Sequence, residues 1–377
     1  MSTLSKRLVA LAGVITLAGT LGACASEPAA DSGSADEGTS AETETEEAGG
    51  SEELSGTIAF LMPDLASTRY EEQDAPLFTA AVAELCPNCE VLYQNADADP
   101  AAQQAQADSA ITQGAEVIVI SSVDTAAAAS IVESAQSQGV AVVTYDRPIT
   151  TKPADFYVSF DNYWIGENIG ISLIEKLEAD GASPDDGGIL VVGGSPTDDA
   201  AGLIFDGQKA AVDASDFSVL AEFRTPEWDP AKAQDWVAGQ ITQFGDQILG
   251  VIAANDGTGG GSVAALKAAG VSPLPPVTGN DAEVAAIQRV IAGDQYNTIS
   301  KPISIVASAA AEVAVGILSG ETPTPDTTLF DTPSKLYVPT VVTQENVKEA
   351  IFDSGIYTAD QVCTDEYADA CAALGIS

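Results

Sequence analysis

The sequence predicts an α/β protein of two lobes, each with a parallel sheet covered by helices. From residue 57 onward, short apolar runs rich in β-branched residues alternate with longer Ala-rich segments, and the alternation starts again after residue 160. Repeated strand–helix units imply parallel strands with helices on both faces. The folded part has roughly 320 residues, more than one hydrophobic core usually holds, so we expect two lobes.

The first part of this pattern predicts strands and helices in turn. Short β-branched runs fit buried strands, whereas longer amphipathic segments fit helices. Gly114 and Gly139 lie where two of these helices should end, because glycine commonly terminates a helix. The expected strands are Thr57–Leu61, Glu90–Tyr93, Val117–Ile120, Ala141–Thr144 and Tyr157–Phe160, and the expected helices are Pro76–Leu85, Pro100–Gln113 and Thr125–Gln138.

The second part repeats the pattern and predicts a second Rossmann-like lobe. Open parallel sheets bind ligands at the carboxyl ends of their strands. Two such lobes facing one another would hold a ligand in the cleft between them. The expected elements are a helix at Tyr163–Leu177 and strands at Ile189–Val192, Val219–Phe223, Leu249–Ala253 and Val277–Gly279, with helices between them.

The first residues of the chain have the pattern of an export signal. Lys6 and Arg7 precede an apolar run, residues 8–21, which is shorter than the roughly 20 residues of a membrane-spanning helix. The order Leu21-Gly22-Ala23-Cys24 resembles a bacterial lipobox, which implies cleavage after residue 23 and acyl chains on Cys24. An ordinary signal peptide followed by a chance cysteine is the alternative. We expect the protein in the cell envelope, held by lipid on the outer face of the cytoplasmic membrane.

Residues 24–53 are predicted to form a disordered tether between the lipidated cysteine and the folded part. This segment holds ten acidic residues, no basic residue and no aromatic residue, so it cannot bury enough apolar area to fold. A flexible chain of this length reaches about 30 Å. The folded part would therefore stay close to the membrane surface.

Charge and composition exclude several classes of function. The formal net charge is −42, from 14 basic and 56 acidic residues, which disfavours nucleic acid and anionic lipid as partners. The chain has no histidine, which excludes Ser-His-Asp and Cys-His catalysis and removes the commonest zinc ligand. We expect no metal site, no cofactor and no catalytic residue.

The cysteines suggest an oxidising compartment. Apart from Cys24, they form two local pairs, Cys86 with Cys89 and Cys363 with Cys371, which we interpret as two disulfides. The alternative for the first pair is a redox-active motif. We disfavour it because the motif ends a predicted helix, whereas a reactive thiolate is favoured at a helix start.

Hydrogen-bonding residues follow the predicted strands, where a cleft would bind its ligand. Carboxylates accept from neighbouring hydroxyls, arginine donates in a fork, asparagine does both, and an indole packs on the C–H face of a sugar. This set suits a polyhydroxylated ligand. Its members are Arg69, Asp146, Arg147, Asp198, Asp199, Trp228, Asn255, Asp256, Asp281 and Lys301.

At these positions the chain resembles the type I periplasmic sugar-binding proteins of ABC transporters, in particular the D-xylose-binding and multiple-sugar-binding branch. The resemblance covers nearly all of residues 57–353. The matching strings are Tyr145-Asp146-Arg147-Pro148-Ile149, Ser159-Phe160-Asp161-Asn162, Gly193-Gly194-Ser195-Pro196-Thr197-Asp198, Asn255-Asp256-Gly257-Thr258-Gly259-Gly260, Gly279-Asn280-Asp281-Ala282 and Lys301-Pro302-Ile303.

The resemblance implies which side chains contact the sugar. Trp228 would stack on the pyranose face, and Tyr70 would add a second aromatic wall. Asp199 is included although relatives tend to carry Asn there, and as a carboxylate it can only accept. The implied ligand-binding residues are Arg69, Tyr70, Asp146, Arg147, Asp199, Trp228, Asn255, Asp281 and Lys301.

The resemblance also implies that three segments connect the lobes, near residues 160–161, 301–302 and 330–335. The expected N-terminal lobe consists of residues 54–160 and 302–330. The expected C-terminal lobe consists of residues 161–301 and 331–377.

The expected function is that of a monomeric receptor, which closes on an aldose and presents it to an ABC permease. A sensor feeding a membrane kinase is a second possibility. A glycosidase using Asp146 and Asp281 is disfavoured because Arg147 and Lys301 would keep these acids ionised. A transcriptional repressor would need a helix-turn-helix module where this chain has the signal and tether.

Overall fold

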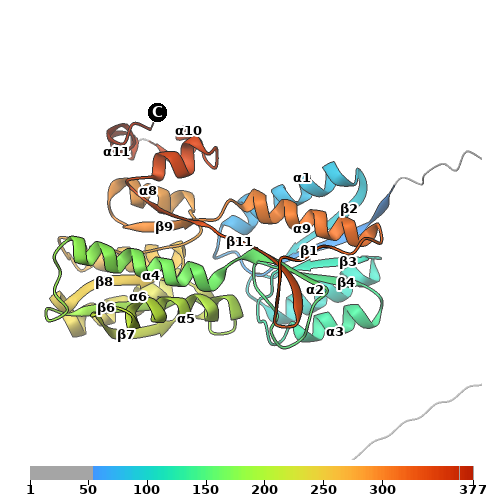
Figure 1. Ribbon diagram of the computed structural model, residues 1–377, viewed down its shortest axis with the longest axis horizontal. Helices are drawn as coiled ribbons and strands as arrows, with labels where there is room; N and C mark the ends of the chain where they lie inside the picture. The colour runs from blue at the N-terminus through green and yellow to red at the C-terminus, as the bar shows by residue number, and fades with distance from the viewer. Residues whose placement is uncertain (1–53, 365, 377) are drawn as a thin grey trace, which may run out of the picture. The chain divides into compact units, whose positions relative to one another are not determined.

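The structure is a computed structural model that describes residues 54–364 and 366–376. The predicted signal peptide, Cys24 and the tether lie outside the described residues. Within that described part, no helix combines the length and apolar character needed to span a bilayer. The described chain forms two α/β lobes, each with its own sheet, as expected (Figure 1).

The first lobe contains a seven-stranded sheet in the order β10-β11-β5-β4-β3-β1-β2. Its strands pair in parallel except for β10, which is antiparallel to β11. The strands are β1 (Ser55–Met62), β2 (Asn88–Asn95), β3 (Val117–Ile120), β4 (Ala141–Tyr145), β5 (Phe156–Phe160), β10 (Thr327–Leu329) and β11 (Thr332–Tyr337).

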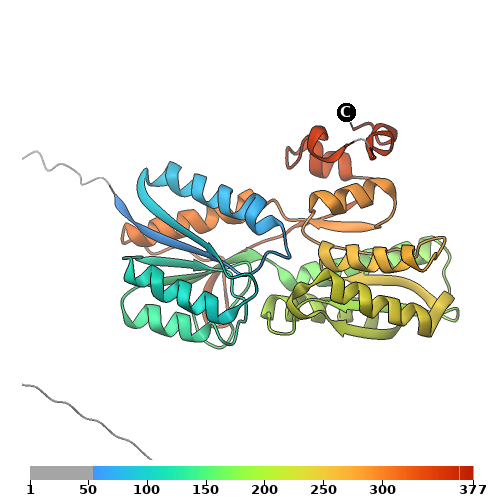
Figure 2. The same cartoon turned by 180° about the vertical axis from the view of Figure 1, so that it is seen from behind.

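Helices cover both faces of this sheet because its strands are apolar on both sides. Side chains alternate along a strand, so Phe60 of β1 packs with one core cluster and Leu61 with another. Helices α1 (Ala75–Leu85) and α9 (Ile303–Leu318) cover the first face, whereas α2 (Pro100–Thr112) and α3 (Ala129–Ser137) cover the second (Figures 1 and 2).

The second lobe is built on β6 (Gly188–Gly193), β7 (Ser218–Arg224) and β8 (Ile248–Ala253), which pair in parallel in the order β7-β6-β8. Helices α4 (Asn162–Ala179) and α5 (Asp199–Asp213) cover one face, and α6 (Pro230–Phe244) and α7 (Asp256–Ala268) cover the other.

Helices α4 and α5 lie unusually close together. A Cβ atom added to Gly166 of α4 would lie 1.9 Å from the carbonyl oxygen of Ile204 in α5, so only glycine fits there. This close packing fixes the first turns of α5, which carry part of the site described below.

The predicted strand Val277–Gly279 is wrong. Only Val277 forms a bridge, to Val251 of β8. Two backbone bonds link this segment to β8, from Val251 N to the Pro276 carbonyl and from Thr278 N to the Val251 carbonyl. Beyond them side chains take over, because the Thr278 hydroxyl bonds the backbone of Ala253 and the side-chain oxygen of Asn297 accepts from Gly279 N. Beyond this point, β9 (Asn297–Ser300) and β12 (Thr340–Thr343) form a separate antiparallel pair.

The third connection between the lobes differs from the expected one. Strand β11 pairs with β5 of the first sheet, and the chain reaches the second lobe only at β12. Residues 332–337, expected in the C-terminal lobe, therefore belong to the first lobe, and the crossing lies at Val338 and Pro339. The sequence of β11, Thr-Pro-Ser-Lys-Leu-Tyr, has neither the β-branched run nor the alternation that predicts a strand.

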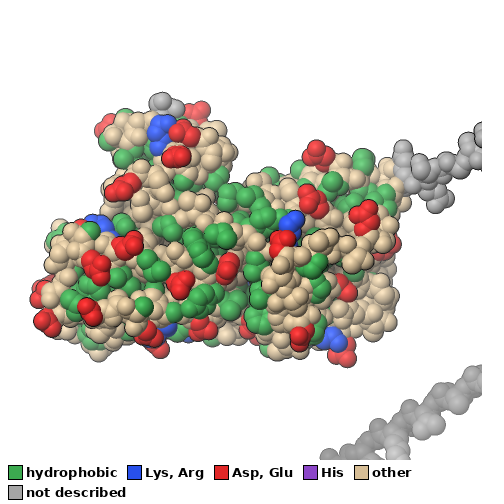
Figure 3. All heavy atoms as spheres, viewed as in Figure 1, with side chains coloured by type: hydrophobic (Ala, Val, Ile, Leu, Met, Phe, Trp, Pro, Cys, Tyr) green, Lys and Arg blue, Asp and Glu red, His purple; other side chains and the backbone are tan. Residues whose placement is uncertain are grey.

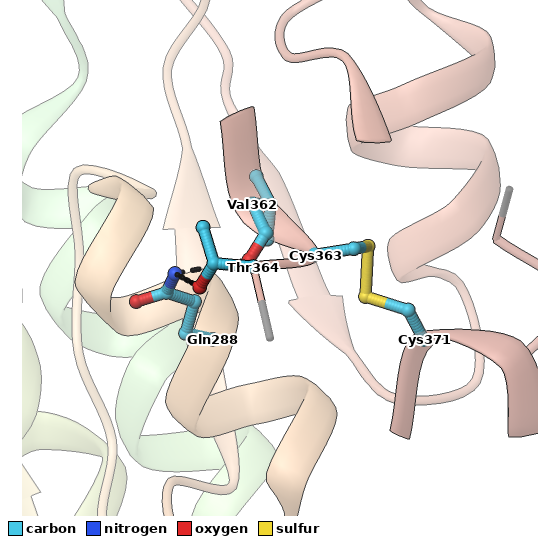
Figure 4. The surroundings of a disulfide bond; sticks show 5 residues. All are labelled: Gln288, Val362, Cys363, Thr364 and Cys371. Carbon is cyan, nitrogen blue, oxygen red and sulfur yellow. Dashed lines mark hydrogen bonds between the residues drawn. A yellow bond between two sulfur atoms is a disulfide. The ribbon is translucent and has the colours of Figure 1, made fainter. Parts of the chain in front are cut away.

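The C-terminal region packs against α8 (Val284–Ala292) in the second lobe. Its disulfide joins Cys363 to Cys371, and Cys86 is joined to Cys89 at the end of α1, so both expected disulfides are present. The Gln288 amide of α8 donates to the Val362 carbonyl, which attaches the disulfide loop to the lobe (Figure 4).

Candidate ligand-binding site

A cavity lies between the lobes where the carboxyl ends of their strands meet. The space in it that is open to a water molecule is about 30 Å³, so the lobes leave little free volume between them in this structure. The lining residues are Ser67, Arg69, Tyr70, Asp146, Arg147, Asn162, Asp198, Ala200, Ile204, Trp228, Asn255, Asn280, Asp281 and Lys301.

Eight of the nine side chains predicted from the sequence line this cavity. The exception is Asp199, which does not line it. Its carboxylate instead accepts a hydrogen bond from the Thr150 hydroxyl at 2.5 Å, outside the cavity. The neighbouring Asp198 occupies the cavity wall in its place.

Asp198 is held by the start of helix α5. As the N-cap residue, it accepts from the backbone N–H of Ala200 at 2.8 Å through Oδ1. Its Oδ2 accepts from Trp228 Nε1 at 3.0 Å and lies 3.0 Å from Arg147 Nε. Since Arg147 follows β4 of the first lobe, this ion pair joins the two lobes.

A second group of charges also crosses between the lobes. The Arg69 guanidinium, which follows β1, binds Asp74 in two places, at 2.8 and 3.0 Å. Its Nη1 lies 3.3 Å from Asp146 and 3.4 Å from Asp281 of the second lobe. Lys301, at the second crossing, lies 2.7 Å from Asp281 and 3.9 Å from Asp146.

Tyr70 connects these two groups. Its hydroxyl donates to Asp146 Oδ2 at 2.9 Å, and its ring lies 5.0 Å from the guanidinium carbon of Arg69 and 5.8 Å from that of Arg147. Asp64 also accepts from Arg147, at 2.6 Å. Both guanidinium groups are thus fixed in position by protein partners.

The electrostatics keep Asp146 charged. Burial alone would raise the pKa of its carboxyl group, but the positive charges of Arg69, Lys301 and Arg147 outweigh this effect and hold that pKa well below its usual range. Burial raises the pKa of the Tyr70 hydroxyl, which therefore stays protonated and able to donate. An ionised Asp146 can accept hydrogen bonds from hydroxyl groups, but it cannot serve as a general acid.

Three of the lining residues have an unusual backbone. Asp146, Trp228 and Asp281 have φ values of 62°, 55° and 107°, in a region that residues other than glycine rarely adopt. Such conformations cost about 1–3 kcal/mol each and cluster at functional sites. They turn the chain sharply in the loops that line the cavity.

Trp228 is positioned by a glycine at the end of β6. A Cβ atom on Gly194 would lie 2.1 Å from the indole ring, so the ring packs directly on the backbone there. With its Nε1 bound to Asp198, the indole is fixed in the cavity wall and buried. The sequence predicted this aromatic wall, but not its support.

Several lining residues were missed by the sequence reasoning. Asn162 begins α4, and its amide nitrogen lies within 3.3 Å of the Tyr157 hydroxyl. Asn280 immediately precedes the predicted Asp281. Asn280 lies one residue from Asp281, which the strand-end pattern identifies, and both asparagines stand in strings that resemble the sugar-binding family, which was the available signal.

A charged, hydrogen-bonding cavity lies between two α/β lobes, and the chain passes from one lobe to the other three times. These features define a two-lobed solute-binding protein. The family comparison agrees. The chain belongs to the periplasmic binding protein domain family, whose family model matches residues 58–322. The predicted family and the predicted fold class, the type I periplasmic-binding-protein fold, are confirmed.

Similar proteins include known sugar binders. The D-xylose-binding periplasmic protein of Escherichia coli K12 is 32% identical over 313 residues, covering 81% of this chain and 92% of that protein. The multiple sugar-binding periplasmic receptor ChvE of Rhizobium radiobacter is 29% identical, covering 81% and 92%. An ABC transporter solute binding protein from Clostridium phytofermentans, solved with bound β-D-glucose, has a TM-score of 0.73 and 28% identity, covering 81% and 99%.

Proposed function

We propose that this chain is the sugar-binding lipoprotein of an ABC-type importer, which closes on a neutral aldose and delivers it to a membrane permease. The main support is the interlobe cavity, whose carboxylates, guanidinium groups and indole match the groups of a pyranose. The similar proteins that bind xylose, glucose or several sugars add to this support.

The charges favour an uncharged ligand. Three cations and three carboxylates line the cavity, and Asp64 and Asp74 also hold the two guanidinium groups. An anionic sugar would therefore bring another negative charge into a site whose cations already have partners. Burying such a charge without compensation is costly.

Contacts between the lobes suit a receptor that closes on its ligand. The ion pairs Arg147–Asp198 and Arg69–Asp281 each join the two lobes at the cavity wall. Away from the wall, Thr125 N donates to the Thr197 carbonyl at 3.0 Å. Hinged closure is the established motion of periplasmic binding proteins.

The proposed anchor is the lipid on Cys24, followed by the acidic tether of residues 25–53. Figure 3 shows acidic side chains spread over the visible face of the folded part, with few basic ones. Such a surface disfavours adhesion to anionic lipid, so membrane attachment would depend on the anchor. Replacing Cys24 with Ser should move the protein from the membrane fraction to the soluble fraction; a variant that stays in the membrane fraction contradicts the proposed anchor.

The enzyme alternative is not supported at the family level, since the similar proteins are solute-binding proteins. The sensor alternative shares the same binding site, and uptake measurements distinguish it from transport. Cells lacking this protein should lose uptake of the bound sugar if it serves an importer.

Calorimetry of the full chain, purified in detergent and unfolded and refolded to remove carried-over ligand, tests the proposed binding. The panel is xylose, glucose, galactose and arabinose, with glucuronate as an anionic control. We expect one-to-one binding of at least one neutral aldose and much weaker binding of glucuronate. Absence of binding to every aldose would refute the proposal.

A further inference from the structure

Asn280 is a buried residue in the cavity wall, and its side-chain oxygen has no partner in the part of the chain that the structure describes. Its residue is 2% exposed, and no hydrogen bond to its Oδ1 occurs among the described residues. Leaving such a group unpaired costs about 1–3 kcal/mol. Because Asn280 also lines the cavity, a ligand that reaches this wall can supply the missing partner.

The neighbouring polar groups in the wall differ from Asn280. Asp281, the next residue, accepts from Lys301 and Arg69, and the Asn255 side chain accepts from Thr258 N at 2.9 Å as the N-cap of α7. These groups are already held in place by the protein. By contrast, no hydrogen bond from another described residue holds the Asn280 side-chain oxygen in place.

The backbone of Asn280 is rigidly fixed. The Asn280 carbonyl accepts from Asp256 N at 2.9 Å. The preceding Gly279 leaves no room for a side chain, since a Cβ atom there would lie 2.1 Å from Asp256 Oδ1. The following Asp281 has a φ of 107°. Little ordering remains to be done when a ligand binds, which favours affinity.

We propose that Asn280 is a specificity-determining residue, whose amide hydrogen-bonds one hydroxyl group of the bound aldose. This inference rests on the proposed sugar-binding function. An amide both donates and accepts, whereas the carboxylates around it only accept. A site built to bond a hydroxyl discriminates strongly against an analogue that lacks it, because the buried amide is then left unpaired.

The test is calorimetry of the full chain with its tightest-binding aldose and the monodeoxy derivatives of that sugar. Two variants are compared with the wild type, Asn280→Leu and, should the larger side chain prevent folding, Asn280→Ala. We expect the variant to bind the parent aldose at least about 10-fold more weakly. One deoxy sugar should bind weakly to the wild type, and the substitution should weaken its binding little further. The hydroxyl that this sugar lacks is then the one that Asn280 binds.

A merely structural role for Asn280 would give a different pattern. Because the Asn280 side-chain oxygen has no partner to lose among residues 54–364 and 366–376, the ligand-free Asn280→Leu variant should unfold at the same temperature as the wild type or higher. A lower unfolding temperature together with equal losses for all the deoxy sugars would overturn the inference. Unchanged affinity for every sugar would also overturn it.

Gln208 provides a matched control. It is fully buried on α5, outside the cavity, and both polar atoms of its amide lack partners among the described residues. Gln208→Met should leave all sugar affinities unchanged; if it alters the deoxy-sugar pattern as Asn280→Leu does, the assignment to Asn280 fails. A wild-type chain that binds no aldose refutes the proposed function and this inference together, whereas wild-type binding with an insensitive Asn280 refutes the inference alone.

Discussion

Replacing Asp198 with Asn tests how the two lobes hold each other closed. The substitution keeps the side-chain volume, and the remaining carbonyl oxygen can still accept from Ala200 N. The new amide group cannot accept from Trp228 Nε1 or Arg147 Nε, as Oδ2 does in the wild type. Two hydrogen bonds are therefore lost, but only one of them affects closure.

The expected loss of ligand affinity depends on which lobe each partner of Asp198 belongs to. Trp228 and Asp198 are both in the second lobe, so their bond is present whether or not the lobes are closed, and its loss cancels in the binding equilibrium. The Arg147 bond forms only on closure, and a hydrogen bond to a charged group contributes about 1.5–3 kcal/mol. Arg147 retains Asp64 as a partner, so it is not left as an unpaired buried charge. The dissociation constant should rise by about 10- to 150-fold.

The assay is calorimetric titration with the tightest-binding aldose, and Asp199→Asn is the control. Asp199 also bonds across the lobes, to Thr150, but it lies outside the cavity, and an amide oxygen can still accept from that hydroxyl. The control should bind within about threefold of the wild type. Equal affinities for Asp198→Asn and the wild type would refute the reasoning, as would a larger loss in Asp199→Asn.

Two further predictions concern the indole wall and pH. Trp228→Ala should raise the dissociation constant about 100-fold, since stacking buries roughly 100 Å² of apolar surface at about 25 cal/mol/Å²; calorimetry with unchanged affinity would show that this ring does not carry the stacking. Burial and the nearby Asp256 and Asp281 raise the pKa of Glu283 to about 8, and burial and Asp281 raise that of Asp256 to about 7 despite Arg289. Because both groups bind protons more tightly folded than unfolded, they contribute full stability below about pH 4, and this contribution falls as pH rises towards 8. In urea unfolding between pH 5 and 8, Glu283→Gln should make the free energy of unfolding fall less steeply with pH, by up to about 1.4 kcal/mol per pH unit. If this free energy has the same pH dependence in the variant and the wild type, the assignment to Glu283 is wrong.

The fold was predictable where the sequence is strongly periodic. The apolar runs of β1, β3 and β6 are buried on both faces, and this requirement is visible in their composition. Strand β11 was missed because it contains a proline, a lysine and two polar residues whose burial depends on β5 and on neighbouring loops. Tertiary context, rather than local preference, makes that segment a strand.

The sequence predicted eight of the nine chosen side chains to gather where the structure has one cavity. Parallel strands bring their carboxyl ends to the same edge of a sheet, so the residues that follow these strands lie close together. The choice between Asp198 and Asp199 depends on which of them caps α5, because the two side chains then point in different directions. Asn280 lines the cavity beside Asp281, whose backbone φ of 107° no local pattern in the sequence indicates.

The discontinuous first lobe has a consequence for how the chain assembles during synthesis. The central sheet of the second lobe and its four covering helices come from one continuous stretch, α4 to α7, residues 162–268. The first lobe must wait for α9 and β11, which end at residue 337. Until they emerge, the apolar face around Phe60 lacks one of its two covering helices, and β5 exposes an unpaired edge of the kind that promotes aggregation. The lobe that is translated first is thus completed only after the central sheet of the other lobe.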